Sequence, residues 1–195
     1  MTSARVSAHV RPDPGSPIVA SFNRVNPQGA TQVFPLIGRA TRSDDVWYRA
    51  MLPIRPNGSS AWMPARGLEI GSTPYRIEID LARFRLRVFE GCHLRETFAI
   101  GIGTQDTPTP IGSFFLNSLL RPPERGSVYG AFAFGLSAYS DVITDWEGGG
   151  IVGLHGTNDP SSIGHEASHG CIRLTNDAIR LLARTVPLGT PVEIS

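Results

Sequence analysis

Glycine and proline recur along the whole chain and leave little room for long helices. The 195 residues include 21 glycines and 16 prolines, and groups such as Pro56-Asn57-Gly58 separate short apolar segments. Proline lacks the backbone N–H that a helix needs, and glycine loses more conformational entropy than other residues in a regular element. Both residue types favour turns. The distribution therefore excludes a helical bundle or a coiled coil as the main architecture and predicts a mainly β fold.

The charge and the cysteine content exclude several classes of function. The formal net charge is +1, so the chain has no overall basic field that would attract nucleic acid or anionic lipid. All 18 basic residues are arginine, which rules out a catalytic lysine, a Schiff base and a P-loop lysine. The two cysteines, Cys92 and Cys171, are too few for a disulfide scaffold or a four-cysteine zinc site.

The first part of the chain has the pattern of a small β domain. Residues 46–52 and 61–63 are predicted strands, and the turn formers of residues 53–58 lie between them. The segment WYRAMLPIRPNGSSAWMPARGLEI resembles the core of a bacterial SH3-like domain. The Gly-Ser-Thr-Pro of residues 71–74 is typical of a short linker.

We therefore expect two domains, a small SH3-like β-barrel over residues 1–72 and a second β-rich domain over residues 73–195. In the second domain, apolar and charged residues alternate over 75–80 and 85–88, which predicts a half-buried antiparallel hairpin. The other expected elements are strands over 97–102, 113–116 and 191–194, a rigid turn over 107–112, and one helix with Asn176 as its N-cap that ends at Pro187.

The residues with reactive side chains gather in one short segment. His155, His165, His169 and Cys171 lie within seventeen residues. One hypothesis is a cysteine nucleophile, because an imidazole can act as the base that a protonated thiol needs. The glycine before Cys171 would let the backbone turn, so that amides there point at an oxyanion. Arg173 would share a strand face with Cys171 and could hold a substrate carboxylate.

A metal site is the alternative for the same residues. The string His165-Glu166-Ala167-Ser168-His169 matches the HExxH pattern of zinc metalloproteases. Its two histidines share one face only on a helix, and the glycines at 164 and 170 would limit that helix to about one turn. We therefore predict no metal and no other cofactor. A third possibility is that these are loop histidines and an inert buried thiol.

Residues 74–195 resemble the catalytic domain of the L,D-transpeptidases, the family also described as ErfK/YbiS/YcfS/YkuD-like. The resemblance is carried by YRIEIDLARFRLRVFEG, by TPTPIGSF, by the dipeptide His155-Gly156, by SHGCIRL, by the helix NDAIRLLARTV and by the closing LGTPVEI. It implies a β-sandwich with one or two short helices. The spacing of sixteen between His155 and Cys171 is within the range of the family.

The resemblance also implies roles for individual residues. Cys171 would be the nucleophile, His155 the general base, and the Gly156 carbonyl the group that orients His155. The backbone amides of His169, Gly170 and Cys171 would form the oxyanion hole. The resemblance matches His165 to no role, so we interpret it as a rim residue.

The substrate side of the pocket is expected to include Arg173, Ser168 and Tyr139. The variable lid of the family corresponds to residues 129–150, which lack the M-P-Y pattern of many relatives. The glycine run 148–150 predicts a flexible loop at the pocket mouth. We interpret the adjacent Cys92 and His93 as incidental, since neighbouring strand residues point to opposite faces.

The implied reaction is acyl transfer on peptidoglycan stem peptides. The thiol would attack the amide between the third residue and the terminal D-Ala of a donor tetrapeptide, and an amine acceptor would resolve the thioester into a 3→3 cross-link. Carbapenems are the implied inhibitors, and we expect a monomer. We also expect an extracytoplasmic location, with an export signal outside this chain, because the first twenty residues lack the apolar region of a signal peptide.

Two other functions remain open from the sequence. One is a cell-wall cysteine peptidase or L,D-carboxypeptidase that acts by hydrolysis. The papain-like members of this class place cysteine before histidine in the chain, whereas His155 precedes Cys171 here. The other is a non-catalytic peptidoglycan-binding envelope protein, which the intact His155 and Cys171 disfavour.

Overall fold

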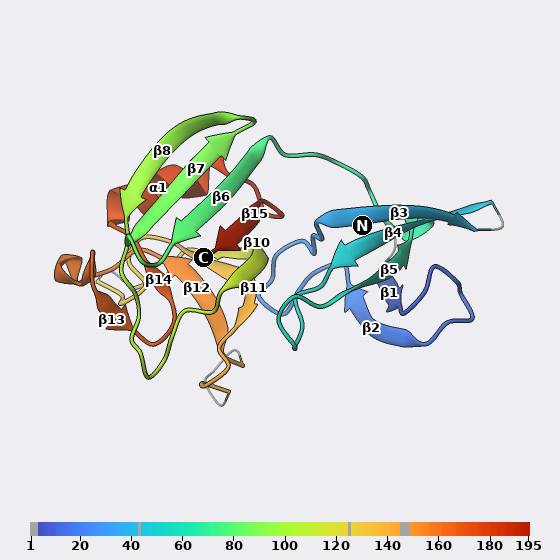
Figure 1. Ribbon diagram of the computed structural model, residues 1–195, viewed down its shortest axis with the longest axis horizontal. Helices are drawn as coiled ribbons and strands as arrows, with labels where there is room; N and C mark the ends of the chain where they lie inside the picture. Colours follow the sequence, from blue (N-terminus) through green and yellow to red (C-terminus); the bar gives the residue numbers. More distant parts are fainter. Residues whose placement is uncertain (1–3, 43, 125, 145–148) are drawn as a thin grey trace. The chain divides into compact units, whose positions relative to one another are not determined.

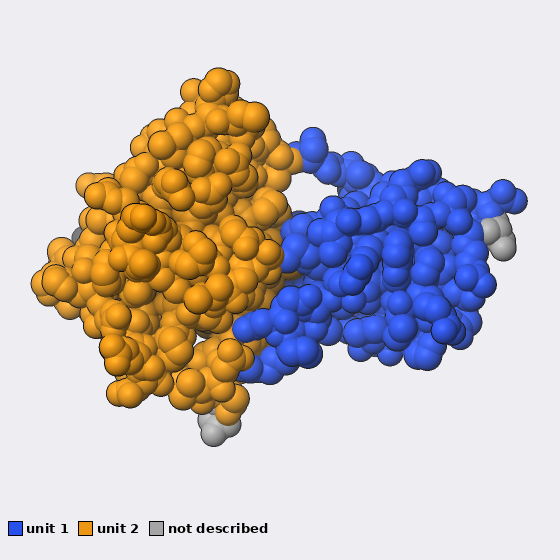
Figure 2. Space-filling view, in the orientation of Figure 1, with its two compact units in different colours: residues 1–72 blue, residues 73–195 orange. Residues whose placement is uncertain are grey.

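The chain folds into two compact units, each with its own hydrophobic core. The computed structural model describes residues 4–42, 44–124, 126–144 and 149–195. The units divide between Ser72 and Thr73 (Figure 2). Strands dominate both units (Figure 1), so the prediction of a mainly β fold is confirmed.

The first unit is a single five-stranded antiparallel sheet with the strand order β2-β1-β5-β4-β3. Its strands are β1 (Arg5–His9), β2 (Ile18–Asn23), β3 (Leu36–Arg42), β4 (Asp45–Met51) and β5 (Ser60–Pro64), followed by the 3-10 turn η1 (Ala65–Gly67). Small and medium apolar side chains such as Val6, Ala50 and Met63 form its core. The strands predicted over 46–52 and 61–63 are confirmed as β4 and β5, whereas the SH3-like identity of the unit stays a prediction.

The second unit is built on a strongly curved eight-stranded sheet with the order β14-β12-β11-β10-β15-β6-β7-β8 (Figure 1). Its strands are β6 (Tyr75–Asp80), β7 (Arg85–Glu90), β8 (His93–Ala99), β10 (Gly112–Leu120), β11 (Ala133–Tyr139), β12 (Ile151–His155), β14 (Ile172–Arg173) and β15 (Pro191–Ile194). The short strands β9 (Ile102–Gly103) and β13 (Glu166–Ser168) pair with each other. Within the described residues, the helical elements of this unit are η2 (Pro160–Ser162) and α1 (Asn176–Thr185).

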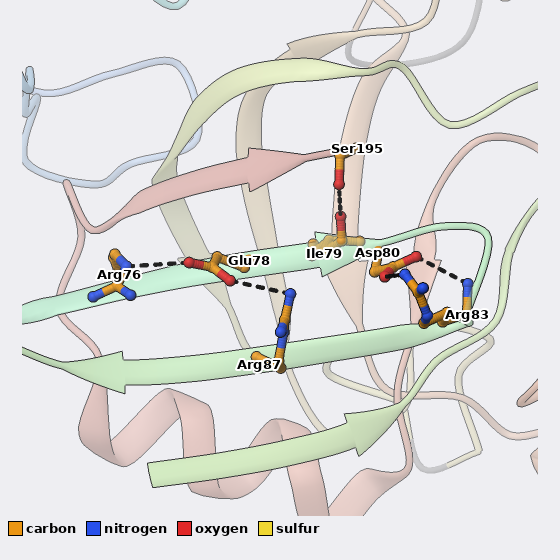
Figure 3. Close-up of polar contacts among 7 residues, drawn as sticks. All are labelled: Arg76, Glu78, Ile79, Asp80, Arg83, Arg87 and Ser195. Atoms are coloured by element: carbon orange, nitrogen blue, oxygen red, sulfur yellow. Dashed lines mark hydrogen bonds and ion pairs between the residues drawn. The ribbon is translucent and has the colours of Figure 1, made fainter. Parts of the chain in front are cut away.

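The β6–β7 hairpin shows why the alternating pattern forms this sheet. Ile77 and Ile79 are buried in the core together with Ile179 and Leu182 of α1, which covers this face of the sheet. The charged residues lie on the opposite face, where Glu78 pairs with two arginines (Figure 3). The predicted hairpin is therefore confirmed, and its hydrophobic face positions α1.

The hairpin turn is closed by a local charge pair. Asp80 accepts hydrogen bonds from the backbone amide and the guanidinium of Arg83, at 3.0 and 2.8 Å (Figure 3). These bonds lower the pKa of the Asp80 carboxyl from its ordinary value. Because the contact is solvent-exposed, it contributes little to the free energy of unfolding. We infer that its main effect is to fix the shape of the turn.

Two predicted boundaries were wrong for local reasons. The strand expected over 97–102 is β8, which runs from His93 to Ala99. Almost all of its side chains are exposed at the sheet edge, so no apolar alternation marks its start. The N-cap of α1 is Thr175, whose Oγ1 accepts a hydrogen bond from the amide of Ala178 at 3.3 Å. Asn176 lies one residue later and bonds to other segments.

The described helices are short. None of them combines the length and the apolar character that crossing a bilayer would require.

Strand β10 offers a matched test of the core. Leu116 is completely buried, whereas Leu120 in the same strand is 46% exposed. We expect Leu116→Ala to lower the free energy of unfolding by about 2–5 kcal/mol, because it leaves a cavity in the core. Leu120→Ala should change it by less than about 0.5 kcal/mol. Urea denaturation of both variants measures the difference, and equal losses would contradict this placement of the core.

Candidate active site

Two neighbouring parallel strands bring the reactive residues onto one face of the sheet. Strand β12 pairs with β14 in the register Leu154 with Ile172 and His155 with Arg173. Side chains alternate along strands, so His155 and Arg173 point to the same face. Cys171 directly precedes β14 and therefore extends this face toward Gly153. The register thus joins residues that are eighteen positions apart in the chain.

The thiol of Cys171 and the imidazole of His155 meet over Gly153. The amide of Gly153 donates a hydrogen bond to Cys171 Sγ at 3.3 Å. A Cβ added to Gly153 would lie 3.6 Å from that sulfur and 3.3 Å from His155 Cδ2. Both groups therefore reach the same space, which a larger residue at position 153 would narrow. Sequence reasoning did not single out this glycine.

One hydrogen bond determines the tautomer of His155. The ring atom Nδ1 lies 2.5 Å from the carbonyl oxygen of Gly156, and His155 is 4% exposed. A carbonyl oxygen can only accept, so Nδ1 carries the proton and Nε2 keeps a free lone pair. Nε2 is bonded to Cδ2, the ring atom near Gly153. The expected orienting contact between Gly156 and His155 is therefore present in the structure.

Burial keeps both reactive groups neutral at neutral pH. It lowers the pKa of His155 to about 4, with a smaller downward effect of Arg173 and an opposing effect of the Gly156 hydrogen bond. Burial also raises the pKa of the Cys171 thiol, against the smaller lowering effects of the Gly153 amide and Arg173. The site is thus suited to general-base activation of a thiol, in which a neutral imidazole accepts the proton.

The turn before Cys171 is held by a buried serine. Ser168 is 3% exposed, and its hydroxyl donates to the carbonyl of Cys171 at 2.6 Å. The Ser168 hydroxyl oxygen in turn accepts a hydrogen bond from the amide of Gly170 at 3.2 Å. The φ angle of Gly170 is +107°. Such a φ favours glycine. Ser168 therefore shapes the turn, and the Gly170 amide, expected in the oxyanion hole, is bonded to it. A role of Ser168 in substrate binding stays a prediction.

The proline-rich turn predicted over residues 107–112, together with the loop before it, supports the segment that precedes Cys171. The amide of Thr104 and the hydroxyl of Thr107 both donate to the carbonyl of Ser168, at 3.0 and 3.3 Å. Thr109 Oγ1 accepts from the amide of Gly103 at 2.9 Å. A Cβ on Gly103 would come within 2.9 Å of Gly170 Cα. The loop that leads into this turn is thus packed closely against the segment before Cys171.

Arg173 combines a fixed backbone with an available side-chain donor. Its amide and carbonyl pair with Gly101 at 2.8 and 2.9 Å. Its Nε is buried and has no hydrogen-bond partner within the part of the chain that the structure describes. A buried donor of this kind is costly unless a ligand or water satisfies it. The position next to His155 agrees with the expected role in the substrate pocket, which stays a prediction.

The histidine motif that suggested zinc is extended rather than helical. Residues 166–168, which lie between the two histidines of the motif, form strand β13. The metalloprotease interpretation of this string is therefore wrong, because it needs both histidines on one face of a helix. His165 and His169 are both exposed. The carbonyl of His165 pairs with the amide of Ile102. Across residues 4–42, 44–124, 126–144 and 149–195, no three His, Cys, Asp or Glu side chains gather as metal ligands.

Tyr139, Cys92 and the glycine run 148–150 are the other residues that the sequence singled out. Tyr139 pairs with Ile151, four positions before His155 along β12, which corresponds to roughly 13 Å. Its substrate role stays a prediction for a position near the other end of the strand. Cys92 is exposed. Gly148 lies outside the described residues, so the flexibility expected for the glycine run is untested there.

Two residues near His155 were missed by the sequence reasoning. The ring of Tyr129 packs edge-on against the imidazole with centroids 5.1 Å apart. Asn176 bonds to the backbone of Thr157, which directly follows the His155–Gly156 segment, and to that of Ala131 on the neighbouring segment. The Tyr129-Gly130 dipeptide at the start of the lid region was a possible signal. Asn176 was interpreted as a helix cap instead.

Comparison with known proteins places this geometry in a family. The profile of the YkuD L,D-transpeptidase catalytic domain matches residues 74–194. The YkuD protein of Bacillus licheniformis is 39% identical over 122 residues, and that of Bacillus subtilis is 34% identical over 122 residues. Each match covers 63% of this chain and 66% of the relative, so the chain spans just under two thirds of these proteins.

A solved structure shows the same fold at lower identity. The LD transpeptidase LdtMt1, solved in complex with imipenem, superposes with a TM-score of 0.50 at 16% sequence identity. The superposition covers 84% of this chain and 100% of that chain. At this level of identity the likeness concerns the fold alone.

The low pKa of His155 predicts a specific pH dependence of stability. The unfolded chain binds a proton between pH 6.5 and about 4 that the folded state does not. The free energy of unfolding should therefore fall as the pH falls through this window, by roughly 2–3 kcal/mol. Urea denaturation at pH 7 and pH 4.5 of the wild type and of His155→Gln isolates this contribution. The same pH dependence in both proteins would refute it.

Proposed function

Because the chain belongs to the L,D-transpeptidase family through residues 74–194, we propose that it forms 3→3 cross-links in peptidoglycan through a Cys171 thioester. The observation that carries the proposal is the meeting of Cys171 Sγ and His155 Cδ2 over Gly153. A neutral imidazole beside a thiol can act as the general base that activates the thiol for acyl transfer. The substrate would be the stem peptide of the cell wall, and the site of action would then be the cell envelope.

The first half-reaction would form the thioester. His155 Nε2 accepts the thiol proton as Cys171 Sγ attacks the carbonyl between the third residue and D-Ala of a donor tetrapeptide. The carbonyl oxygen becomes an oxyanion, which the backbone amides of His169 and Cys171 would stabilise, because the Gly170 amide is bonded to Ser168 Oγ. His155 then returns its proton to the leaving amine, the C–N bond breaks, and D-Ala departs. The Gly156 carbonyl stabilises the imidazolium that forms in between.

The second half-reaction would consume the thioester. The amine of a neighbouring stem peptide attacks the thioester carbonyl and gives up a proton to His155 Nε2. The C–S bond breaks, the new amide forms the cross-link, and the proton returns to Cys171 Sγ. Water in place of the amine would give hydrolysis, so the identity of the acceptor decides between transpeptidation and carboxypeptidation.

Arg173 would supply the positive charge for substrate binding. Its buried Nε lacks a hydrogen-bond partner in the described residues, and a substrate carboxylate is the group that would satisfy it. The same charge lowers the pKa of both His155 and Cys171. It would therefore help to keep the base neutral while it favours a negative charge on sulfur.

Acylation by a carbapenem tests the nucleophile directly. We expect intact mass spectrometry to show one covalent adduct on the wild type and none on Cys171→Ala, because the thiol of Cys171 shares the space over Gly153 with the imidazole of His155. The matched control is Cys92→Ser, which removes the other cysteine and should keep the adduct. An adduct on Cys171→Ala, or none on the wild type, would reject the proposed function.

Purified peptidoglycan fragments test the reaction itself. We expect disaccharide tetrapeptides to yield D-Ala and a 3→3 linked dimer, both identified by mass spectrometry. Tripeptide monomers in place of dimers would favour the hydrolytic alternative. Release of neither product would contradict both activities on this substrate.

Removal of the Arg173 charge should alter the site in two measurable ways. In Arg173→Gln the pKa of His155 should rise above about 4, because a nearby positive charge is lost. We also expect kcat/KM for the tetrapeptide to fall about 10-fold or more, since a buried charge-assisted contact is lost. The control is Arg180→Gln on α1, which removes an exposed arginine. An unchanged His155 titration, followed by NMR, would contradict this role.

A further inference from the structure

The side chain of Asn176 connects three segments around the His155–Gly156 pair. Its Oδ1 accepts a hydrogen bond from the amide of Ala131, and its Nδ2 donates to the carbonyl of Thr157, both at 2.8 Å. An amide nitrogen can only donate and a carbonyl can only accept, so these partners specify one orientation of the side chain. The residue lies in α1, while its partners lie on two segments that run side by side just beyond the β11–β12 pair of Ala133 and His155.

Two glycines allow this side chain to enter. A Cβ on Gly156 would clash with Asn176 Oδ1. Gly130 has φ of +65°, and a Cβ there would lie 2.5 Å from Thr157 N and 2.6 Å from the carbonyl carbon of Gly156. The peptide group between Gly156 and Thr157 is therefore packed directly against the backbone of Gly130. A side chain at position 130 would therefore collide with this peptide group.

This peptide group carries the oxygen that accepts the His155 hydrogen bond. On one side, the amide of Gly156 donates to the carbonyl of Phe132 at 3.1 Å. On the other side, the carbonyl of Thr157 accepts from Asn176. We propose that Asn176 is a positioning residue, which holds the Gly156–Thr157 peptide so that the Gly156 carbonyl stays on Nδ1 and His155 keeps Nε2 as its base.

The helix itself does not require this side chain. Thr175 is the N-cap of α1 and accepts from the amide of Ala178, so the capping function is already filled. The hydrogen bond from the Ala131 amide to Asn176 also fixes the backbone two residues after Tyr129. The ring of Tyr129 packs against the imidazole of His155. Asn176 thus holds both the acceptor and the packing partner of His155.

The proposal rests on the role of His155 as the base for Cys171, and two variants test it. Asn176→Ala removes both bonds. Asn176→Asp keeps an acceptor for the Ala131 amide, removes the donor to Thr157, and places an acidic residue in the first turn of α1, where it favours the helix. The matched control is Asn158→Ala, because Asn158 is exposed and donates to the backbone of Gly126 in the same region.

The first measurement is the tautomer of His155 in each folded protein. Side-chain ¹H–¹⁵N NMR, with the His155 signal assigned by its loss in His155→Gln, should show Nδ1–H with bare Nε2 in the wild type and Asn158→Ala. We expect a mixture of tautomers in both Asn176 variants. A merely structural role of Asn176 would lower the unfolding temperature without changing this ratio.

The second measurement is the rate constant for acylation of Cys171 by a carbapenem at pH 7. We expect a decrease of roughly 10- to 100-fold in both Asn176 variants, because a misplaced base loses its alignment, and less than about 2-fold in Asn158→Ala. A wild-type tautomer and rate in folded Asn176→Asp would overturn the proposal. If the wild type itself is not acylated, the proposed function fails, whereas the tautomer comparison still decides the role of Asn176.

Discussion

The parallel pairing of β12 with β14 is the constraint on which the rest of the site depends. Its register sets His155 beside Arg173 and leaves Cys171 next to Gly153, although these residues come from separate segments. The pairing is possible because the segment before β14 turns back at Gly170, where Ser168 and the loop behind it hold the backbone. A shift of one residue would move the side chains to the opposite face.

Burial then determines how these groups react. A thiol and an imidazole that are both removed from water prefer their neutral forms, so the resting site is not an ion pair. In the proposed reaction, the proton would move only when an acyl donor arrives and the developing charge is stabilised. The buried neutral histidine also lowers the stability of the fold in acid, because it resists protonation.

Most of the fold could be predicted because its strands follow simple rules. The β6–β7 hairpin alternates apolar and charged residues, and the helix ends before Pro187. Strand β8 was misplaced because an exposed edge carries no such pattern. Asn176 was assigned to the helix cap because asparagine is common there, but the choice between Thr175 and Asn176 depends on the partners that the folded chain brings near each.

The amino-acid sequence supplies the candidate groups: a cysteine, a histidine followed by glycine, and an arginine in motifs typical of L,D-transpeptidases. Which of these groups share one site follows from the tertiary structure alone. In the folded chain, Gly153 lies next to the thiol and the imidazole, and Ser168 forms a hydrogen bond within the turn before Cys171. Asn176 packs against the Gly156–Thr157 peptide. The physical reason is that hydrogen bonds and close packing act between segments far apart in the chain, and local residue patterns do not encode their register.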